Sequence, residues 1–208
     1  MPSPHRYAVW ASGRGSNFKA MLDACREGRL RYRPALLLTD NAAAPALDRA
    51  REEGLETLFI DPKVYRGRKA FGEKAIEALV ARGIDTVVLA GFMRIVDGAV
   101  VRAFPNRIIN IHPALLPRFP GLHAQEQAIA AGVSESGCTV HFVDEGVDTG
   151  PTIMQAKVPV LSGDTAETLS ARILVEEHRI YPAVVQALME DRIVMADGRG
   201  IITDSPKP

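Results

Sequence analysis

Residues 7–17 read Y-A-V-W-A-S-G-R-G-S-N, and this stretch decides the fold. Its first five residues form a continuous apolar run, which is typical of a buried strand, and the following Ser-Gly pair ends that run. From Asn17 the sequence N-F-K-A-M-L-D-A-C has the apolar spacing of an amphipathic helix, which we expect to end near Gly28. A buried strand that passes through a glycine turn into a helix is the beginning of a βαβ unit.

The same alternation continues through the first half of the chain. Apolar runs predict strands at 35–39, 57–61 and 86–91, and amphipathic runs predict helices at 45–54 and 68–83. Because short strands alternate with helices, we predict a fold of the α/β class with a mostly parallel, twisted sheet. These strands are apolar throughout, so we expect helices on both faces of the sheet.

The second half of the chain has a different character. Residues 113–123 contain three prolines and a glycine, which predict an ordered, proline-stiffened loop. Beyond it we expect a short helix at 124–131, strands at 138–143 and 152–160, a long helix at 165–191 and a terminal hairpin at 192–202. No repeat, low-complexity stretch or flexible linker interrupts the sequence. We therefore expect residues 1–208 to form a single domain.

The composition argues against several classes of protein. Its 25 Lys and Arg residues balance 25 Asp and Glu residues, so a nucleic-acid partner bound through a broad basic field is not expected. Two cysteines, Cys25 and Cys138, give no disulfide framework and no metal spacing, which predicts reduced thiols and a cytoplasmic location. No long apolar segment predicts a signal peptide or a membrane helix, so we expect no membrane partner. The sequence leaves monomer and homodimer open.

The glycine turn S-G-R-G-S-N, residues 12–17, is the first candidate binding motif. Backbone N–H groups at such a strand-to-helix turn converge on an anion, and the helix dipole adds to the attraction. The turn lacks the third glycine of the dinucleotide fingerprint, because Phe18 stands there, and it lacks the G-K-S/T of a P-loop. It therefore favours a small phosphate monoester, although a plain connecting turn would have the same glycines.

The stretch I-N-I-H, residues 109–112, ends another buried strand and places two polar side chains at its end. Asn110 and His112 are two apart, so they point to the same side of the strand. Ligands of α/β proteins bind beyond the carboxyl ends of parallel strands, where this pair lies. A lone histidine is nevertheless more often structural than catalytic.

Three acidic residues follow in the stretch V-D-E-G-V-D-T-G, residues 143–150. Asp144, Glu145 and Asp148 could be solvated carboxylates of a turn. Two acids at this spacing could also suggest a cation site, but no further His or Asp array completes one. We therefore predict no metal site.

Taken together, four stretches resemble one family. They are S-G-R-G-S-N-F at 12–18, L-A-G-F-M-R-I at 89–95, I-N-I-H-P-A-L-L-P-R-F-P-G-L-H at 109–123 and G-C-T-V-H-F-V-D-E-G-V-D-T-G-P at 137–151. They resemble the phosphoribosylglycinamide formyltransferases, or glycinamide ribonucleotide transformylases, of the folate-dependent formyltransferase superfamily. The third and fourth stretches are shared across that superfamily, whereas the glycine turn and the chain length select this family within it.

The resemblance implies a Rossmann-like formyltransferase fold and a one-carbon transfer reaction. The formyl group of 10-formyltetrahydrofolate, a co-substrate, would pass to the amine of 5-phosphoribosylglycinamide in purine biosynthesis. Direct attack through a tetrahedral intermediate is implied, with small-molecule substrates only. The resemblance also implies one catalytic domain, with the ribonucleotide phosphate on the side of the N-terminal half and the folate on the side of the C-terminal half.

The same resemblance gives roles to three catalytic residues. Asn110 and a protonated His112 would donate hydrogen bonds to the negative charge that develops on the formyl oxygen. His112 would also protonate N10 of the departing folate as a general acid. Asp148 matches the carboxylate that favours the charged imidazolium and orders proton transfer from the amine.

The binding residues are also carried over by resemblance. The phosphate and sugar of the ribonucleotide would be bound by Gly15, Ser16, Asn17 and Glu177. The folate would be bound by Arg68, Met93, Arg94, Ile95, Val96 and Asn110, with Arg68 near its glutamate end. His123 and His141 match positions near the site without an assigned role. Read without the resemblance, the apolar members of the folate set are ordinary core, and Arg68 is a solvated helix charge.

Three other functions share parts of this pattern. Methionyl-tRNA formyltransferase shares residues 109–151 but carries a further RNA-binding domain, which we do not expect after Pro208. A formyltetrahydrofolate deformylase-like hydrolase would need a regulatory domain before the first strand, where we expect none. A non-catalytic folate or nucleotide binding protein would have no reason to keep an acid–base histidine beside an oxyanion donor. The second and third stay as alternatives.

Overall fold

The apolar runs of the first half form a parallel sheet in the computed structural model, which describes residues 5–206. Its strands are β1 (Tyr7–Trp10), β2 (Leu36–Thr39), β3 (Glu56–Phe59) and β4 (Thr86–Leu89). They lie in the order β3-β2-β1-β4, and each neighbouring pair is parallel. The inner strands and β4 are buried at every residue, whereas β3 at the edge is partly exposed. This burial explains why the inner strands are apolar throughout.

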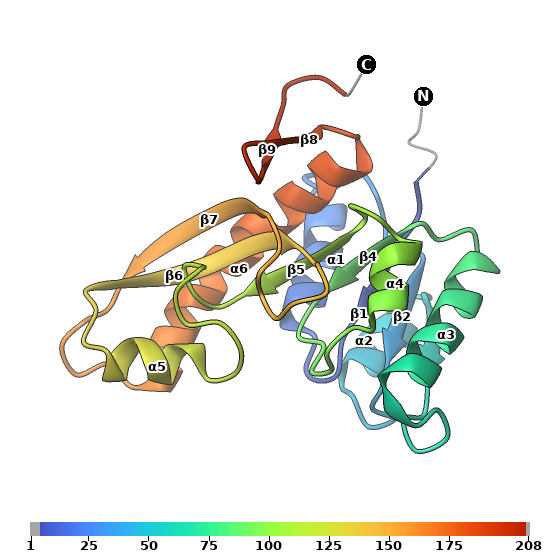
Figure 1. The fold of residues 1–208 in the computed structure, drawn as a ribbon, viewed down its shortest axis with the longest axis horizontal. Helices are drawn as coiled ribbons and strands as arrows, with labels where there is room; N and C mark the ends of the chain where they lie inside the picture. The colour runs from blue at the N-terminus through green and yellow to red at the C-terminus, as the bar shows by residue number, and fades with distance from the viewer. Residues whose placement is uncertain (1–4, 207–208) are drawn as a thin grey trace. The chain divides into compact units, whose positions relative to one another are not determined.

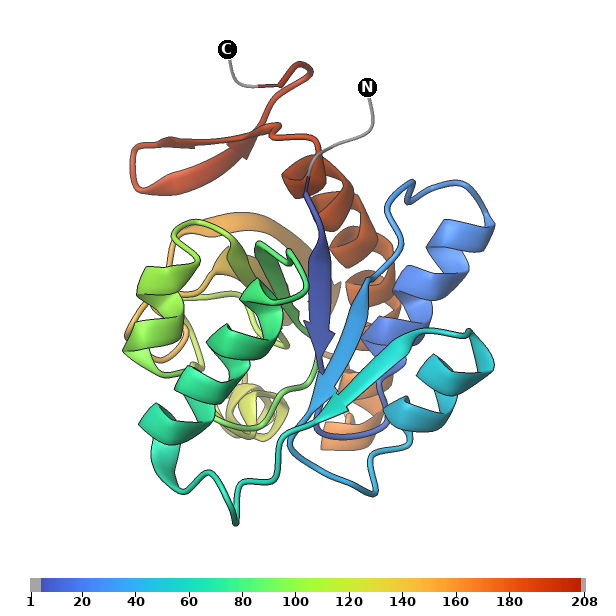
Figure 2. The same cartoon turned by 90° about the vertical axis from the view of Figure 1, so that its right-hand side faces the viewer.

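Helices cover both faces of this sheet, as predicted. They are α1 (Ser16–Arg26), α2 (Ala46–Glu52), α3 (Gly67–Val80) and α4 (Gly98–Ala103). Figure 2 shows α1 and α2 on one side of the strands and α3 on the other; α1 contacts α2, and α3 contacts α4. The sequence analysis missed α4, because its six residues are too short for a periodic pattern. Asp97 caps it by accepting the Ala99 N–H at 2.9 Å.

The second half builds an antiparallel layer covered by a long helix. After β5 (Ile108–His112) come α5 (Ala124–Ala130), β6 (Glu135–Phe142), β7 (Thr152–Pro159) and α6 (Ala166–Met189). The strand order is β5-β6-β7, β6 and β7 are antiparallel, and α6 packs on both (Figure 1). The helix predicted at 165–191 is continuous through Pro182, which lies inside it.

A two-stranded hairpin follows α6, as predicted from the sequence. Its strands are β8 (Ile193–Ala196) and β9 (Arg199–Ile202), and β9 contacts β7. Gly200 allows this close approach, because a Cβ atom there would lie 2.9 Å from the Ile153 side chain. The hairpin is thus part of the packing of the second half.

The chain has the predicted α/β fold with a mainly parallel sheet, and it divides into two compact units after Ile109. The single catalytic domain over residues 1–208 stays a prediction. Within the described part of the chain, no helix is both long enough and apolar enough to cross a membrane.

The turn between β1 and α1 depends on a glycine. Gly15 has φ of 64°, in the left-handed region, and stands at the N-cap of α1. A Cβ atom at this position would lie 2.8 Å from Cβ of Ala46 at the start of α2, so one helix would have to shift. Gly28, beyond the other end of α1, has φ of 73° but no atom within 4 Å of such a Cβ.

These two glycines make a matched pair for a stability measurement. Gly28→Ala should lower the free energy of unfolding by about 1–2 kcal/mol, the cost of a left-handed conformation for an L-residue. Gly15→Ala should cost more, because the contact with Ala46 adds to the conformational term. Urea denaturation of both variants measures the difference, and equal losses would show that the turn tolerates the added methyl group.

Candidate active site

An ion pair between the end of β5 and the β6–β7 loop forms the centre of the candidate site. His112 is the last residue of β5, and its Nδ1 lies 3.2 Å from Oδ2 of Asp148. The histidine is 4% exposed, so solvent hardly screens the pair. Asp148 has φ of 55°, a left-handed conformation that aspartate tolerates better than most residues. The structure therefore brings together two of the three predicted catalytic residues.

Both ring nitrogens of His112 face oxygen atoms. Nδ1 faces the Asp148 carboxylate, and Nε2 lies 2.8 Å from the carbonyl oxygen of Phe119. A neutral imidazole carries one N–H and would leave a lone pair against one of these oxygens, whereas an imidazolium donates to both. Each ring nitrogen of His112 therefore has an oxygen acceptor within hydrogen-bond reach.

Asp148 is surrounded by donors. Its Oδ2 accepts the backbone N–H of Gly121 at 2.8 Å, and its Oδ1 lies 3.5 Å from Nε2 of His141. Burial pushes the pKa of the Asp148 carboxyl upward. The hydrogen bonds from His141 and Gly121 and the charges on His112 and His141 outweigh that effect and hold the pKa below its ordinary value. Asp148 is thus a fixed negative charge at neutral pH.

His141, in β6, contacts both Asp148 and Asn110, the third predicted catalytic residue. Its Nδ1–H donates to the Phe142 carbonyl at 2.8 Å, which leaves Nε2 facing Asp148 and Asn110. Nδ2 of Asn110 lies 3.3 Å from that Nε2, so the amide nitrogen, a donor, is turned toward the ring. The sequence placed His141 near the site without a role, because its contacts come from two other segments of the chain.

The candidate anion-binding turn in the first unit is hydrogen-bonded to Asn41 and to two residues of α2. Three successive carbonyls, those of Ser12, Gly13 and Arg14, accept from the Asn41 side chain at 3.0 Å, from the Ala46 N–H at 3.2 Å and from Arg49 Nε at 2.9 Å. In a trans peptide the N–H points opposite to the C=O, so the next three N–H groups point away from α2. At the start of α1 no side chain makes a capping hydrogen bond and no acidic residue stands in the first turn, so the helix start favours an anion.

The structure places the predicted ribonucleotide residues in both units. Gly15 caps α1, and Ser16 and Asn17 are its first two residues, with Asn17 buried. Glu177 lies on α6 in the second unit and is 6% exposed. A buried glutamate on an otherwise amphipathic helix is unusual, and periodicity alone gives no reason for it.

The predicted folate segment, residues 93–96, follows β4 and is largely exposed. Met93 and Ile95 are 66% and 51% exposed, so the alternative that they are ordinary core is wrong. The Met93 N–H donates to Ser12 Oγ at 2.9 Å, which ties this segment to the anion-binding turn. Val96 is half-buried.

A cluster of aromatic side chains contacts this segment through Arg94. The Arg94 guanidinium lies 5.3 Å from the ring centre of Phe71, and that ring packs against Phe92 and Trp10. Arg68, exposed in the first turn of α3, precedes Phe71 by three residues, so both lie on one face of that helix. Segment 93–96 and Arg68 are therefore on the same side of the first unit.

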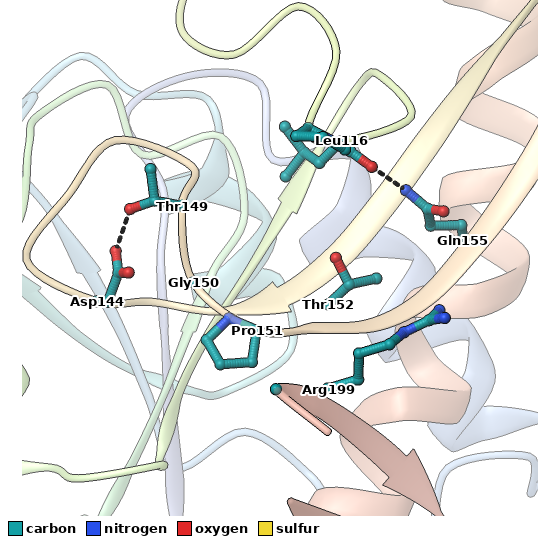
Figure 3. Close-up of a pocket in the computed structure, with 10 residues that line it drawn as sticks. Leu116, Asp144, Thr149, Gly150, Pro151, Thr152, Gln155 and Arg199 are labelled. Atoms are coloured by element: carbon teal, nitrogen blue, oxygen red, sulfur yellow. Dashed lines mark hydrogen bonds between the residues drawn. The ribbon is translucent and has the colours of Figure 1, made fainter. Parts of the chain in front are cut away.

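A cavity of about 600 Å³ opens beside the loop that carries Asp148. It is lined by Leu116, Pro117, Asp144, Thr149, Gly150, Pro151, Thr152, Gln155, Gly198 and Arg199 (Figure 3). The Thr149 hydroxyl donates to Asp144 at 2.7 Å, and this bond shapes the loop on either side of Asp148. Asp144 therefore has a structural part in the turn, and the cavity lining does not include the three predicted catalytic side chains.

The sequence and the fold of this chain were both compared with those of known proteins. The model of the formyl transferase family matches residues 5–185. Phosphoribosylglycinamide formyltransferase of Escherichia coli is 41% identical over 187 residues, which cover 90% of this chain and 88% of that protein. The crystal structure of glycinamide ribonucleotide transformylase 1 from Symbiobacterium toebii superposes with a TM-score of 0.93 at 54% identity, covering 96% of this chain and 94% of the other.

Longer relatives contain the same domain among others. The trifunctional purine biosynthetic protein adenosine-3 of Bos taurus is 43% identical over 196 residues, and these cover 94% of this chain but 19% of that protein. The chain thus spans about a fifth of the length of that relative. The matched region includes every candidate site residue. The chain belongs to the formyl transferase family, and relatives that it matches over most of their length are named phosphoribosylglycinamide formyltransferase or glycinamide ribonucleotide transformylase.

Proposed function

We propose that this chain transfers the formyl group of 10-formyltetrahydrofolate to the amine of 5-phosphoribosylglycinamide, as a step of purine biosynthesis. The observation that carries the proposal is the pair of the buried His112 and the half-buried Asp148, with His141 in contact with both Asp148 and Asn110. This arrangement offers a positive proton donor and a neutral hydrogen-bond donor at the end of one strand. Acyl transfer to an amine requires both kinds of group.

Asn110 stabilises the negative charge of the tetrahedral intermediate. When the amine nitrogen attacks the formyl carbon, charge develops on the formyl oxygen, and preorganised donors lower the barrier. The Asn110 amide carries two N–H donors on Nδ2, and one of them is assigned to that oxygen.

His112 supplies the proton that the departing folate needs. The amine nitrogen first bonds to the formyl carbon to give the tetrahedral intermediate, and the bond from that carbon to N10 breaks when the intermediate collapses. N10 gains a proton from His112, and the amine nitrogen loses one in the transfer that Asp148 orders. The Phe119 carbonyl occupies His112 Nε2 in this structure and must give way to N10 for that transfer. Asp148 keeps the ring charged until then, and the reaction needs no covalent intermediate.

The binding residues divide the two substrates. Gly15, Ser16 and Asn17 bind the ribonucleotide phosphate through backbone N–H groups and the start of α1, and Glu177 binds the sugar. The exposed segment 93–96 binds the pterin ring of the folate through backbone groups, and Arg68 lies near its glutamate end. We extend the proposal to a single cytoplasmic catalytic domain, monomeric or homodimeric; the other activities of the trifunctional relatives form no part of it.

A choice of acceptors separates this function from its alternatives. The purified chain is offered 10-formyltetrahydrofolate together with phosphoribosylglycinamide, with charged initiator tRNA, or with water alone. Formyl transfer to phosphoribosylglycinamide supports the proposal. Release of formate with no acceptor would instead identify a deformylase-like hydrolase, and folate binding without turnover would identify a non-catalytic binding protein.

Removal of the imidazole should abolish most of the catalysis. His112→Ala should lower kcat by on the order of 10²–10⁴-fold, the usual contribution of a general acid. His5→Ala is the matched control, because His5 precedes β1 and its ring contacts Asp85 and Arg107 rather than a candidate site residue. Steady-state assays of formyl transfer measure both variants, and a His112 variant that stays close to the control would remove the general-acid role.

The charge on Asp148 should be visible in the pH dependence. Its pKa is lowered, so the carboxylate is ionised above the ordinary carboxyl range of about 4, and its stabilising effect is lost only as the pH falls below that range. Asp148→Asn should slow transfer and remove the loss of activity at acid pH that protonation of the Asp148 carboxylate causes, because Asn does not titrate. Asp144→Asn, whose amide oxygen can still accept from Thr149, is the control. An unchanged profile for Asp148→Asn would exclude this residue from the titrating pair.

A further inference from the structure

Two side chains outside the reacting groups hold the base of the loop that touches the catalytic pair. Thr139 in β6 is fully buried, and Gln155 in β7 is its direct cross-strand partner. Both reach the backbone of residues 114–116, which follow β5. We infer that Thr139 and Gln155 form a clamp that positions His112 and Asp148 for the proposed formyl transfer, on which this inference rests.

The clamp consists of four hydrogen bonds made by the Thr139 hydroxyl and the Gln155 amide nitrogen. The Thr139 hydroxyl donates to the Ala114 carbonyl at 2.6 Å and accepts from the Leu116 N–H at 3.0 Å and from Gln155 Nε2 at 2.8 Å. The second Nε2 hydrogen of Gln155 goes to the Leu116 carbonyl at 2.9 Å (Figure 3). A carbonyl cannot donate, so this amide has one allowed orientation, with its nitrogen toward Leu116. Both backbone polar groups of Leu116 are thereby fixed.

The clamp lies a few residues before the two backbone groups that hold the catalytic pair. Phe119, whose carbonyl accepts from His112, is three residues after Leu116, and Gly121, whose N–H donates to Asp148, is five residues after it. Three residues span at most roughly 10 Å of extended chain, so the place of Leu116 limits the place of both groups. The Arg118 N–H also donates to the Leu115 carbonyl at 3.1 Å, which shortens the path further.

The position of this loop has an electrostatic consequence. The Gly121 N–H is among the groups that hold the pKa of the Asp148 carboxyl below its ordinary value. If the base of the loop is released, this N–H moves away, and Asp148 keeps its charge over a narrower pH range. The Phe119 carbonyl moves at the same time, so the orientation of the His112 ring is no longer fixed from both sides.

Gln155→Met is the main test, because Met has a similar length and removes both donated hydrogen bonds. Gln155 is exposed at the surface of β7, so the substitution leaves the core intact. Lys157→Met is the matched control: Lys157 is exposed on the same face of β7, two residues further on, and its ammonium pairs with Glu135 rather than with the loop that follows β5. Thr139→Val removes the hydroxyl from the other half of the clamp, and Thr139→Ser restores it.

Three measurements are made on each variant with 10-formyltetrahydrofolate and phosphoribosylglycinamide. For Gln155→Met and Thr139→Val we expect kcat to fall by on the order of 10- to 100-fold, as for small misplacements of reacting groups, with KM for phosphoribosylglycinamide nearly unchanged. The acid limb of the pH profile should move to higher pH. Hydrogen exchange at the Leu116 and Gly121 amides should be faster than in the wild type, which reports the loop without any turnover. Thr139→Ser and Lys157→Met should match the wild type.

The outcomes separate this inference from the proposed function. Absence of formyl transfer by the wild-type chain would overturn the proposed function, whatever the variants do. Transfer by the wild type, together with a Gln155→Met profile and exchange equal to those of Lys157→Met, would overturn the clamp alone. A lower Tm for both clamp variants with an unchanged pH profile and unchanged exchange at Gly121 would leave a purely structural role and would also overturn it.

Discussion

A half-buried carboxylate, that of Asp148, lies between two imidazole rings and sets the requirements for the second unit. Removing a charged group from water costs several kcal/mol, and only close donors and opposite charges offset this cost. Asp148 obtains them from His112, His141 and the Gly121 N–H, which come from three separate segments. These segments must therefore be held in place together. Much of the structure around the site can be understood as the means of holding them.

The loop at 113–123 provides that support with backbone groups rather than side chains. Phe119 has φ of 55° and His123 has φ of 61°, conformations that are uncommon for residues with a side chain. Such strain is kept where the surroundings compensate for it, and it is concentrated at functional sites. Here the compensation includes the bond from His112 to the Phe119 carbonyl and the buried bonds of Thr139. Through the Gly121 N–H, the same loop also helps to hold the pKa of the Asp148 carboxyl below its ordinary value.

The first unit handles charge in a different way. Its candidate phosphate site uses no cationic side chain among the predicted residues, and it relies on N–H groups whose carbonyl ends are fastened by Asn41, Ala46 and Arg49. Oriented dipoles of this kind attract an anion without placing a counter-ion in the site. The two units thus contribute complementary chemistry, with fixed dipoles in one and titratable side chains in the other.

The sequence by itself determined the fold class and the order of the strands and helices other than α4, and it predicted which residues react. Continuous apolar strands between helices require a covered parallel sheet, and Asn110 and His112 share a side of one strand whatever surrounds them. It could not predict α4, which is shorter than two helical turns, or the exposure of Met93 and Ile95, which depends on how a loop lies. Only the tertiary structure decided that His141 joins Asn110 to Asp148 and that Phe119 occupies the second nitrogen of His112. Such contacts join residues that are distant in the chain or set by loop geometry, and the periodicity of a sequence carries no record of either.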